Sequence, residues 1–271
     1  MVATTESSSA DRRRLRLPRQ LLIGLATIVV MLAIWYMLTT SLGVIDPNRF
    51  PSPEQFFAAL EQMMTTGYAG GNLIDHLLRS LVLVVSGFLV AVAVGVPLGF
   101  VMGYDKRAEA FFNPIFLLLR PIPPLAWIPL AIVWLGITDA SKMLVIFVSA
   151  FVPSVINTFT GVRNVNRTLV EAAQVHGATR GRLIREVYVP DAMPLIFTGL
   201  RLSLQAAWTT LVAAELVGAF LGLGRVLSTA YRDINTAMIL LAMVVIAIAG
   251  ALTTQALGIV ERRLIKWRTG P

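Results

Sequence analysis

The sequence is organised as long apolar runs separated by short polar segments. A helix needs about 20 mostly apolar residues to cross a bilayer's hydrocarbon core. Two runs, 110–138 and 192–224, reach that length but contain charged residues. Four uncharged runs also reach it: 20–45, 80–104, 143–162 and 234–260. The pattern therefore predicts an all-α, polytopic membrane protein with six transmembrane helices.

Composition and charge support this class. Hydrophobic residues make up 56% of the chain and charged residues 14%, whereas a soluble domain carries about 25% charged residues. The chain has no cysteine and two histidines, which excludes disulfides and thiolate metal sites. Its net charge of +8 fits membrane orientation better than nucleic-acid binding, since the cations form no single basic face. We expect contact with lipid and none with nucleic acid.

The basic residues predict an orientation. Sixteen of the 23 Lys and Arg residues fall in segments 1–19, 103–113, 163–191 and 261–271. Cytoplasmic loops carry the excess of Lys and Arg, so we expect both termini in the cytoplasm.

The same reasoning divides the chain. We expect a cytoplasmic tail over 1–19, a first transmembrane helix over 20–45 and an external loop over 46–79. A five-helix core over 80–260 and a cytoplasmic tail over 261–271 would follow. In the external loop, Ser52 or Pro53 would begin a short helix that ends at Gly67. His76 is expected as an interfacial side chain.

Residues 163–191, here called the coupling segment, are polar between two apolar runs. Thr168 and Glu171 have the spacing of a capping box, and Gly177 stands where a left-handed C-cap residue is favoured. Thr179 would then cap a second helix, which prolines at 190 and 194 would end. The pattern predicts two short surface helices. They suit either a linker resting on lipid headgroups or a docking element, and their small alanines favour docking.

Several ordered motifs carry a family resemblance. EAA at 171–173, Gly177 and VYVP at 187–190 resemble the EAA loop of type I ABC-importer permeases, although two valines stand where Ile and Leu are usual. IPPLAWIPLAIVWLGI, GLRLSLQAAW and AELVGAFLGLGRVL are similar to permeases for sulfonate, taurine, nitrate and bicarbonate uptake. The resemblance implies that the coupling segment docks on an ATP-binding subunit. Its implied contact residues are Glu171, Ala172, Ala173, Gly177 and Arg180.

The resemblance also implies the assembly. A homodimer in the bacterial inner membrane would work with two ATP-binding subunits and an external substrate-binding protein. The cargo would be a small oxyanion, with aliphatic sulfonate or taurine first and nitrate, bicarbonate or aromatic carboxylate as alternatives.

The chain lacks a phosphate-binding loop of the G-x-x-x-x-G-K-[ST] type. ATP and Mg would therefore be bound by the partner, and we expect neither enzyme activity nor a cofactor or metal in this chain. Two other functions stay open at this point: an ATP-independent carrier or channel using Arg201 and Glu215, and a membrane anchor that transports nothing.

Two groups of residues are candidates for the translocation path. Arg201, Gln205, Trp208 and Glu215 have helical spacing on one face, and polar side chains within spans usually face a protein interior or a cavity. A purely structural pairing of Arg201 is the alternative. Prolines break the helix over 121–129, so Pro124 and Trp127 would border the path or the dimer centre. The alternative there is a kinked helix start, with Arg120 reaching the interface.

Overall fold

The structure is a computed structural model that describes residues 19–46 and 49–265. All elements in those ranges are helical. Most of the predicted tails, 1–18 and 266–271, lies outside the described residues. The chain divides into two compact units, residues 1–54 and 55–271, and each is described by itself.

The first unit contains one candidate span. Helix α1 (Arg19–Tyr36) continues as a π-helical turn over Met37–Ser41. Its apolar stretch Ile23–Ser41 is long enough to cross a membrane, and 6% of the tested window is buried within the chain. The indole N–H of Trp35 donates to the Pro51 carbonyl at 2.9 Å. The length and apolar composition of the Ile23–Ser41 stretch suit a membrane span.

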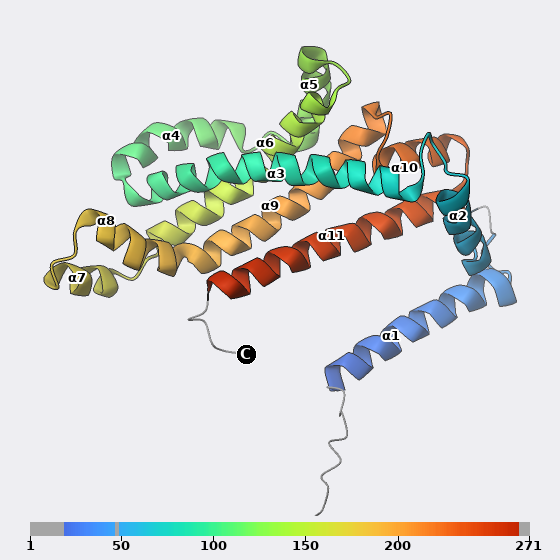
Figure 1. Cartoon of the computed structure of the whole chain (residues 1–271), viewed down its shortest axis with the longest axis horizontal. Coiled ribbons are helices and arrows are strands. Elements are labelled where there is room, and N and C mark those ends of the chain that lie inside the picture. Colours follow the sequence, from blue (N-terminus) through green and yellow to red (C-terminus); the bar gives the residue numbers. More distant parts are fainter. Residues whose placement is uncertain (1–18, 47–48, 266–271) are drawn as a thin grey trace, which may run out of the picture. The chain divides into compact units, whose positions relative to one another are not determined.

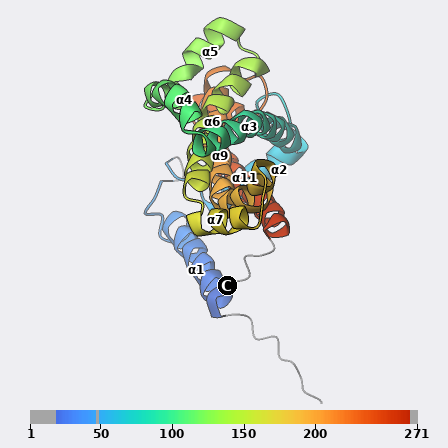
Figure 2. The same ribbon diagram turned by 90° about the vertical axis from the view of Figure 1, so that its left-hand side faces the viewer.

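The second unit is a helical bundle with short helices at both ends (Figure 1). α3, α6, α9 and α11 run along its length, with α7 and α8 at one end and α2 and α10 at the other. Both views place α4 and α5 on the side of the bundle away from α11 (Figure 2). The bounds are α2 Pro53–Thr65, α3 Leu73–Tyr104, α4 Lys106–Leu119, α5 Trp127–Leu135, α6 Asp139–Arg163, α7 Arg167–Val175, α8 Arg180–Leu183, α9 Val189–Gly218, α10 Leu223–Arg232 and α11 Thr236–Leu264.

Small residues let α3 approach α6 closely. A Cβ atom at Gly99 would lie 2.5 Å from the Val155 carbonyl oxygen, and one at Gly95 would lie 2.9 Å from the Ser154 Cβ. A stripe of glycines brings two backbones together where larger side chains would hold them apart. The main core lies beside this contact and includes Val84, Ile146 and Leu211, from α3, α6 and α9.

The predicted span over 110–138 is not one helix. α4 and the 124–135 segment meet at an angle of 73°, and a 3-10 turn over Pro124–Ala126 lies between α4 and α5. Proline lacks a backbone N–H and its ring obstructs the preceding turn of a helix, so the break was expected from the sequence. The structure has five helices suited to spanning among the described residues, or six if this bent pair is counted.

The predicted short helix between the first two spans is confirmed as α2, which begins at Pro53. α3, however, begins at Leu73, inside the segment predicted as a loop. The Asn72 side chain accepts from the Asp75 backbone N–H at 3.0 Å, and the Asp75 carboxylate accepts from the Asn72 N–H at 3.2 Å. This reciprocal cap starts the helix before the apolar run begins.

Candidate functional sites at the two ends of the bundle

The coupling segment begins with a capped helix, but the cap is not the predicted one. Asn166 is the N-cap of α7, and its side-chain oxygen accepts from the Thr168 N–H at 2.9 Å. Asn166 also donates its own N–H to the Asp191 carboxylate at 3.1 Å. The prediction that Thr168 caps this helix is therefore wrong. Asn is at least as good an N-cap as Thr, and this one also ties α7 to the start of α9.

Gly177 provides the turn after α7, as predicted. Its φ is +76°, a left-handed conformation that glycine adopts at little cost. The Ala178 N–H donates to the Ala173 carbonyl at 3.0 Å, which closes the helix end. Apart from Gly177 and its chain neighbours, no described residue has an atom within 4 Å of where a Cβ would stand, so the backbone conformation, and not a lack of space, favours glycine here.

The second helix of the coupling segment does not stop at the prolines. Thr179 stands at the N-cap of α8, although its side chain makes no capping hydrogen bond. α8 passes through a π-helical turn over Ile184–Tyr188 directly into α9. Pro190 is the second residue of α9 and directly follows the π-helical turn, and Pro194 lies inside that helix; local π-helical adjustments let a membrane helix accommodate proline. The prediction that these prolines end the helix is wrong, and one helical stretch of 39 residues covers Arg180–Gly218.

The predicted docking residues lie on an open surface. Ala173 is partly buried, and the other four are exposed: Glu171, Ala172, Gly177 and Arg180. Two apolar side chains beside them, Val175 and Leu169, are 85% and 50% exposed. This part of the chain therefore presents small and apolar side chains around the exposed Glu171 and Arg180.

Three of the four polar residues predicted on one face of α9 lie together. Arg201, Gln205 and Trp208 line a groove of about 860 Å³, together with Thr254 and Gln255 of α11. Arg201 is paired with Glu261 of α11, and the Trp208 indole N–H donates to the Thr253 hydroxyl at 3.0 Å. The groove is therefore polar near Arg201, and these two polar contacts join α9 to α11.

Pro124 joins this region, whereas Trp127 does not. Pro124 borders a hollow of about 360 Å³ whose lining includes Gln205 and Thr209. Trp127 packs beside the small core formed by Ile128, Ala131, Val145 and Ala214. Its indole nitrogen is buried and has no hydrogen-bond partner within the described part of the chain.

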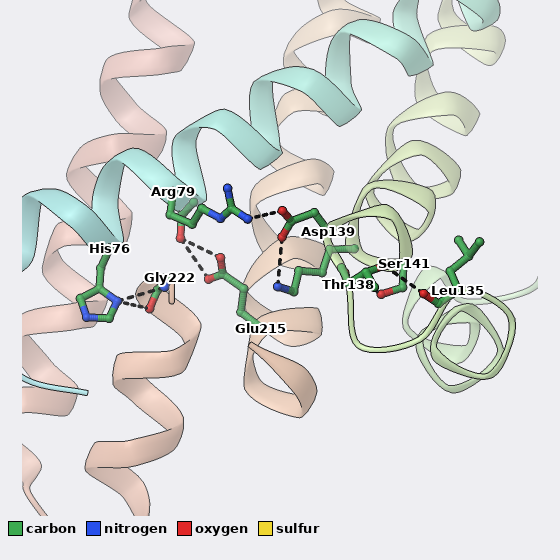
Figure 3. Close-up of polar contacts among 10 residues, drawn as sticks. His76, Arg79, Leu135, Thr138, Asp139, Ser141, Glu215 and Gly222 are labelled. Atoms are coloured by element: carbon green, nitrogen blue, oxygen red, sulfur yellow. Dashed lines mark hydrogen bonds and ion pairs between the residues drawn. The ribbon is translucent and has the colours of Figure 1, made fainter. Parts of the chain in front are cut away.

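The fourth residue of that predicted face, Glu215, lies away from Arg201. Its side chain is 1% exposed and points toward α3. The Ser80 hydroxyl lies 2.9 and 3.0 Å from its two carboxylate oxygens, and the Gly224 N–H donates to it at 2.8 Å. Figure 3 shows Glu215 near the ion pair of Arg79 with Asp139. Asp139 also contacts Lys142.

Glu215 is one of three side chains that cap α10. The first N–H groups of a helix have no partner within the helix, and the N-cap here is Gly222, which has no side chain. The Gly222 N–H lies 3.0 Å from Nδ1 of His76, and the Leu223 N–H donates to the Ser80 hydroxyl at 2.9 Å. Because the Gly224 N–H donates to Glu215, three consecutive backbone N–H groups are satisfied by side chains of α3 and α9. We call His76, Ser80 and Glu215 the α10 clamp.

The glycines of this turn make room for the clamp. A Cβ at Gly222 would lie 2.2 Å from a Glu215 carboxylate oxygen, and Gly222 has a φ of +137°. A Cβ at Gly224 would lie 2.6 Å from the Glu215 Cβ. Both positions therefore require glycine while Glu215 occupies this site.

The sequence reasoning missed two members of the clamp. His76 was predicted at the interface, which is wrong: it is fully buried, and Nε2 lies 2.9 Å from the Tyr68 carbonyl oxygen. Ser80, four residues later, is equally buried on the same face of α3. The available signal was this spacing, combined with a glutamate shortly before a Gly-Leu-Gly turn. Among the described residues, no cluster of three or more His, Cys, Asp or Glu side chains is arranged to bind a metal.

Comparison with known proteins gives a consistent family. Residues 95–266 match the family described as the inner membrane component of binding-protein-dependent transport systems. The chain is 37% identical to the taurine transport system permease protein of Escherichia coli (strain K12), covering 98% of both chains. It is 36% identical to the putative aliphatic sulfonates transport permease protein of Bacillus subtilis (strain 168), covering 90% of this chain and 87% of the relative.

A more distant relative and a solved structure extend the comparison. The bicarbonate transport system permease protein of Synechococcus elongatus is 30% identical over 91% of this chain and 90% of its own length. An inward-facing structure of the MetNI methionine ABC transporter matches with a TM-score of 0.61 and 20% identity, covering 73% of this chain and 96% of the matched chain. At that identity the structural match establishes a shared fold.

Proposed function

The chain belongs to the family of inner membrane components of binding-protein-dependent transport systems, and we propose that it forms the membrane path of an ATP-driven importer for a small oxyanion. The observation that carries the proposal is the coupling segment. It leaves Glu171, Ala172 and Gly177 exposed, and it continues without a break into α9, which lines the groove beside Arg201.

In this proposal the coupling segment docks on an ATP-binding subunit. ATP binding and hydrolysis there would move α7 and α8, and a continuous helix passes such a displacement along its length. α9 extends from the coupling segment to Gly218, so one element connects the docking surface with the groove and the α10 clamp. Alternation between two packings of such helices is a rigid-body transition.

The assembly follows from the same premise. Two copies of the chain would form the membrane path, with two ATP-binding subunits and one substrate-binding protein. Both termini and the coupling segment would face the cytoplasm, because sixteen of the 23 Lys and Arg residues fall on that side. The α10 end would then face outward, where the binding protein delivers its cargo.

Support for an oxyanion as cargo comes from the relatives and the groove. Relatives are described as permeases for taurine, aliphatic sulfonates and bicarbonate, and we place taurine or an aliphatic sulfonate first. Arg201 supplies a guanidinium group in the groove, where it is paired with Glu261. The binding protein would make most of the selection among these anions.

An ATP-independent carrier that uses Arg201 and Glu215 as a coupled pair has little support from the structure. Arg201 is bound to Glu261 on α11, whereas Glu215 is bound to Ser80 on α3. The two residues are fourteen positions apart, which corresponds to about 21 Å along a helix. A pair that exchanges ions or protons directly would have to lie much closer.

Gly177→Val in the reconstituted importer tests the proposal. Valine strongly disfavours a φ of +76°, so the turn between α7 and α8 should rearrange and ATP-driven uptake should fall by about tenfold or more, the equivalent of about 1.4 kcal/mol. Gly181→Val is the matched control, since that glycine also has open space around it but no positive φ. Normal coupled uptake in Gly177→Val, or uptake driven by an ion gradient without the ATPase, would contradict the proposal.

A further inference from the structure

We propose that the α10 clamp is a positioning device that makes α10 and the 219–222 loop move as one body with the end of α9. Motion that enters at the coupling segment would then reach the opposite end of the bundle through Glu215. The inference rests on the proposed function for the source of the motion, whereas the clamp itself can be tested in the permease alone.

The first support is the origin of the acceptors. An N-terminal cap normally comes from the helix's own N-cap side chain, which Gly222 lacks. The acceptors for Gly222, Leu223 and Gly224 instead come from α3 and α9, at 3.0, 2.9 and 2.8 Å. The first turn of α10 is therefore held by those two helices, whereas Val226 and Ala230 further along α10 pack against α2 and α11.

The second support is the place of Glu215 in α9. It stands in the last turn of a helix that ends at Gly218 and has no break after the π-helical turn over Ile184–Tyr188. The Ser80 hydroxyl bridges the two sides of the clamp, because it contacts the Glu215 carboxylate and also accepts from Leu223. A displacement of the end of α9 therefore acts on α10 directly.

The third support is burial, which keeps the clamp closed. Glu215 is 1% exposed and His76 and Ser80 are 0% exposed. Opening the clamp would leave a buried carboxylate and three N–H groups without partners, and such groups are costly when unpaired. The start of α3, the end of α9 and the start of α10 therefore move together instead of separating. Phe220 of the 219–222 loop is 82% exposed and would move with these helix ends.

The mobility of the 219–222 loop reports directly whether the α10 clamp is closed. The chain has no cysteine, so Phe220→Cys accepts a single spin label on the loop. Phe111→Cys, on α4 and 67% exposed, is the reference label. Ser80→Ala should raise the mobile fraction at position 220 by about fivefold or more, because it removes the hydrogen bonds of Ser80 with both Glu215 and the Leu223 N–H. It should leave the label at position 111 unchanged.

A matched variant separates the clamp from general packing. Ser203 is a buried serine of α9 that shares a 2.8 Å hydrogen bond with Ser154 of α6. Ser203→Ala therefore removes the same kind of interhelical bond away from α10, and the label at position 220 should stay as immobile as in the parent. Equal mobility at position 220 in both serine variants, or no change in either, would overturn the inference.

A conservative replacement identifies which property of Glu215 acts. Glu215→Gln keeps an oxygen for the Gly224 N–H and a polar group within reach of Ser80, so the loop should stay immobile. Glu215→Ala should release it. If the glutamine variant is as mobile as the alanine variant, charge and not hydrogen bonding positions the loop, and the clamp as described is wrong.

The number of cargo molecules imported per ATP hydrolysed tests the functional role of the clamp. In the importer reconstituted with its ATPase and binding protein, Ser80→Ala should retain stimulated ATP hydrolysis but import fewer cargo molecules per ATP, whereas Ser203→Ala should keep the parental ratio. An unchanged ratio in Ser80→Ala would contradict the role of the clamp in coupling. Absence of ATP-driven uptake in the parent would instead contradict the proposed function and leave the mobility result standing.

Discussion

The coupling segment and the α10 clamp lie at opposite ends of the Arg180–Gly218 helical stretch, and they are built in opposite ways. In the coupling segment the side chains of Glu171, Ala172 and Gly177 are open to solvent. In the clamp, His76, Ser80 and Glu215 are almost completely buried, and each binds a backbone N–H of one turn.

The difference indicates where each site finds its partner. A polar group in an apolar interior must be satisfied inside the chain, and the clamp meets this requirement with groups from three helices. A surface that binds a second protein keeps its groups hydrated until that protein arrives. We therefore expect changes in the clamp to alter the free energy of unfolding, and changes in the coupling segment to alter coupling with little effect on that free energy.

The largest effect on stability is expected from Gly222→Ala. The new Cβ would lie 2.2 Å from Glu215, at a φ of +137°, so steric overlap and backbone strain act together. We expect the free energy of unfolding to fall by about 3 kcal/mol or more, measured by thermal unfolding of the purified permease. Gly250→Ala is the control, because its nearest contact would be an ordinary 4.0 Å. A Gly222 variant as stable as this control would contradict the tight packing of the clamp.

A smaller effect is expected from Tyr68→Phe near the clamp. The Tyr68 hydroxyl donates to Asp233, which joins the turn before α3 to the turn before α11. Burial, followed by the hydrogen bond and the charge of Asp233, raises the pKa of Tyr68 above its usual 10. The folded state therefore retains this proton at pH values where the unfolded chain loses it, so the contribution is present below about pH 10 and is lost as pH rises further.

Two measurements check this prediction. The phenylalanine variant should lose about 1 kcal/mol of unfolding free energy at neutral pH, and the deficit relative to the parent should shrink above about pH 10. Urea or thermal unfolding at several pH values reports both effects. A deficit that stays constant up to strongly alkaline pH would argue against the Tyr68–Asp233 bond as its source.

The smallest effect is expected in the coupling segment, from Glu186→Gln. Arg182 and Glu186 form an exposed pair at 3.0 Å, with side chains 63% and 61% exposed. Such pairs contribute about 0.3–0.5 kcal/mol and weaken in salt. We expect a change in unfolding free energy within that range, which disappears at high ionic strength. A loss as large as that of a clamp variant would remove the contrast between the two sites.

The sequence predicted features that depend on local chemistry. Apolar runs gave the spans, the prolines at 121, 123 and 124 gave the break between α4 and α5, and Gly177 gave the turn of the coupling segment. Each of these follows from the residue itself or from the bilayer, without knowledge of what packs against it.

Features that depend on distant partners were not predictable in this way. His76 and Gly222 are 146 residues apart, so nothing near His76 indicates that it will be buried against another helix. Thr168 matched a capping motif, but Asn166, two residues earlier, caps α7 instead and donates its own N–H to Asp191. Pro190 and Pro194 looked like a helix end, but the π-helical turn before them let the helix continue.

Cross-linking from Val175→Cys tests most directly whether the coupling segment docks on an ATP-binding subunit. Val175 is 85% exposed beside the predicted docking residues, and Tyr231→Cys, 78% exposed in α10, is the control. With no other cysteine in this chain, a short bifunctional reagent reports the neighbours of one site. We predict a nucleotide-sensitive cross-link from position 175 to the ATPase during turnover, and none from position 231. If position 175 never cross-links to an ATP-hydrolysing subunit while uptake proceeds, the account is contradicted.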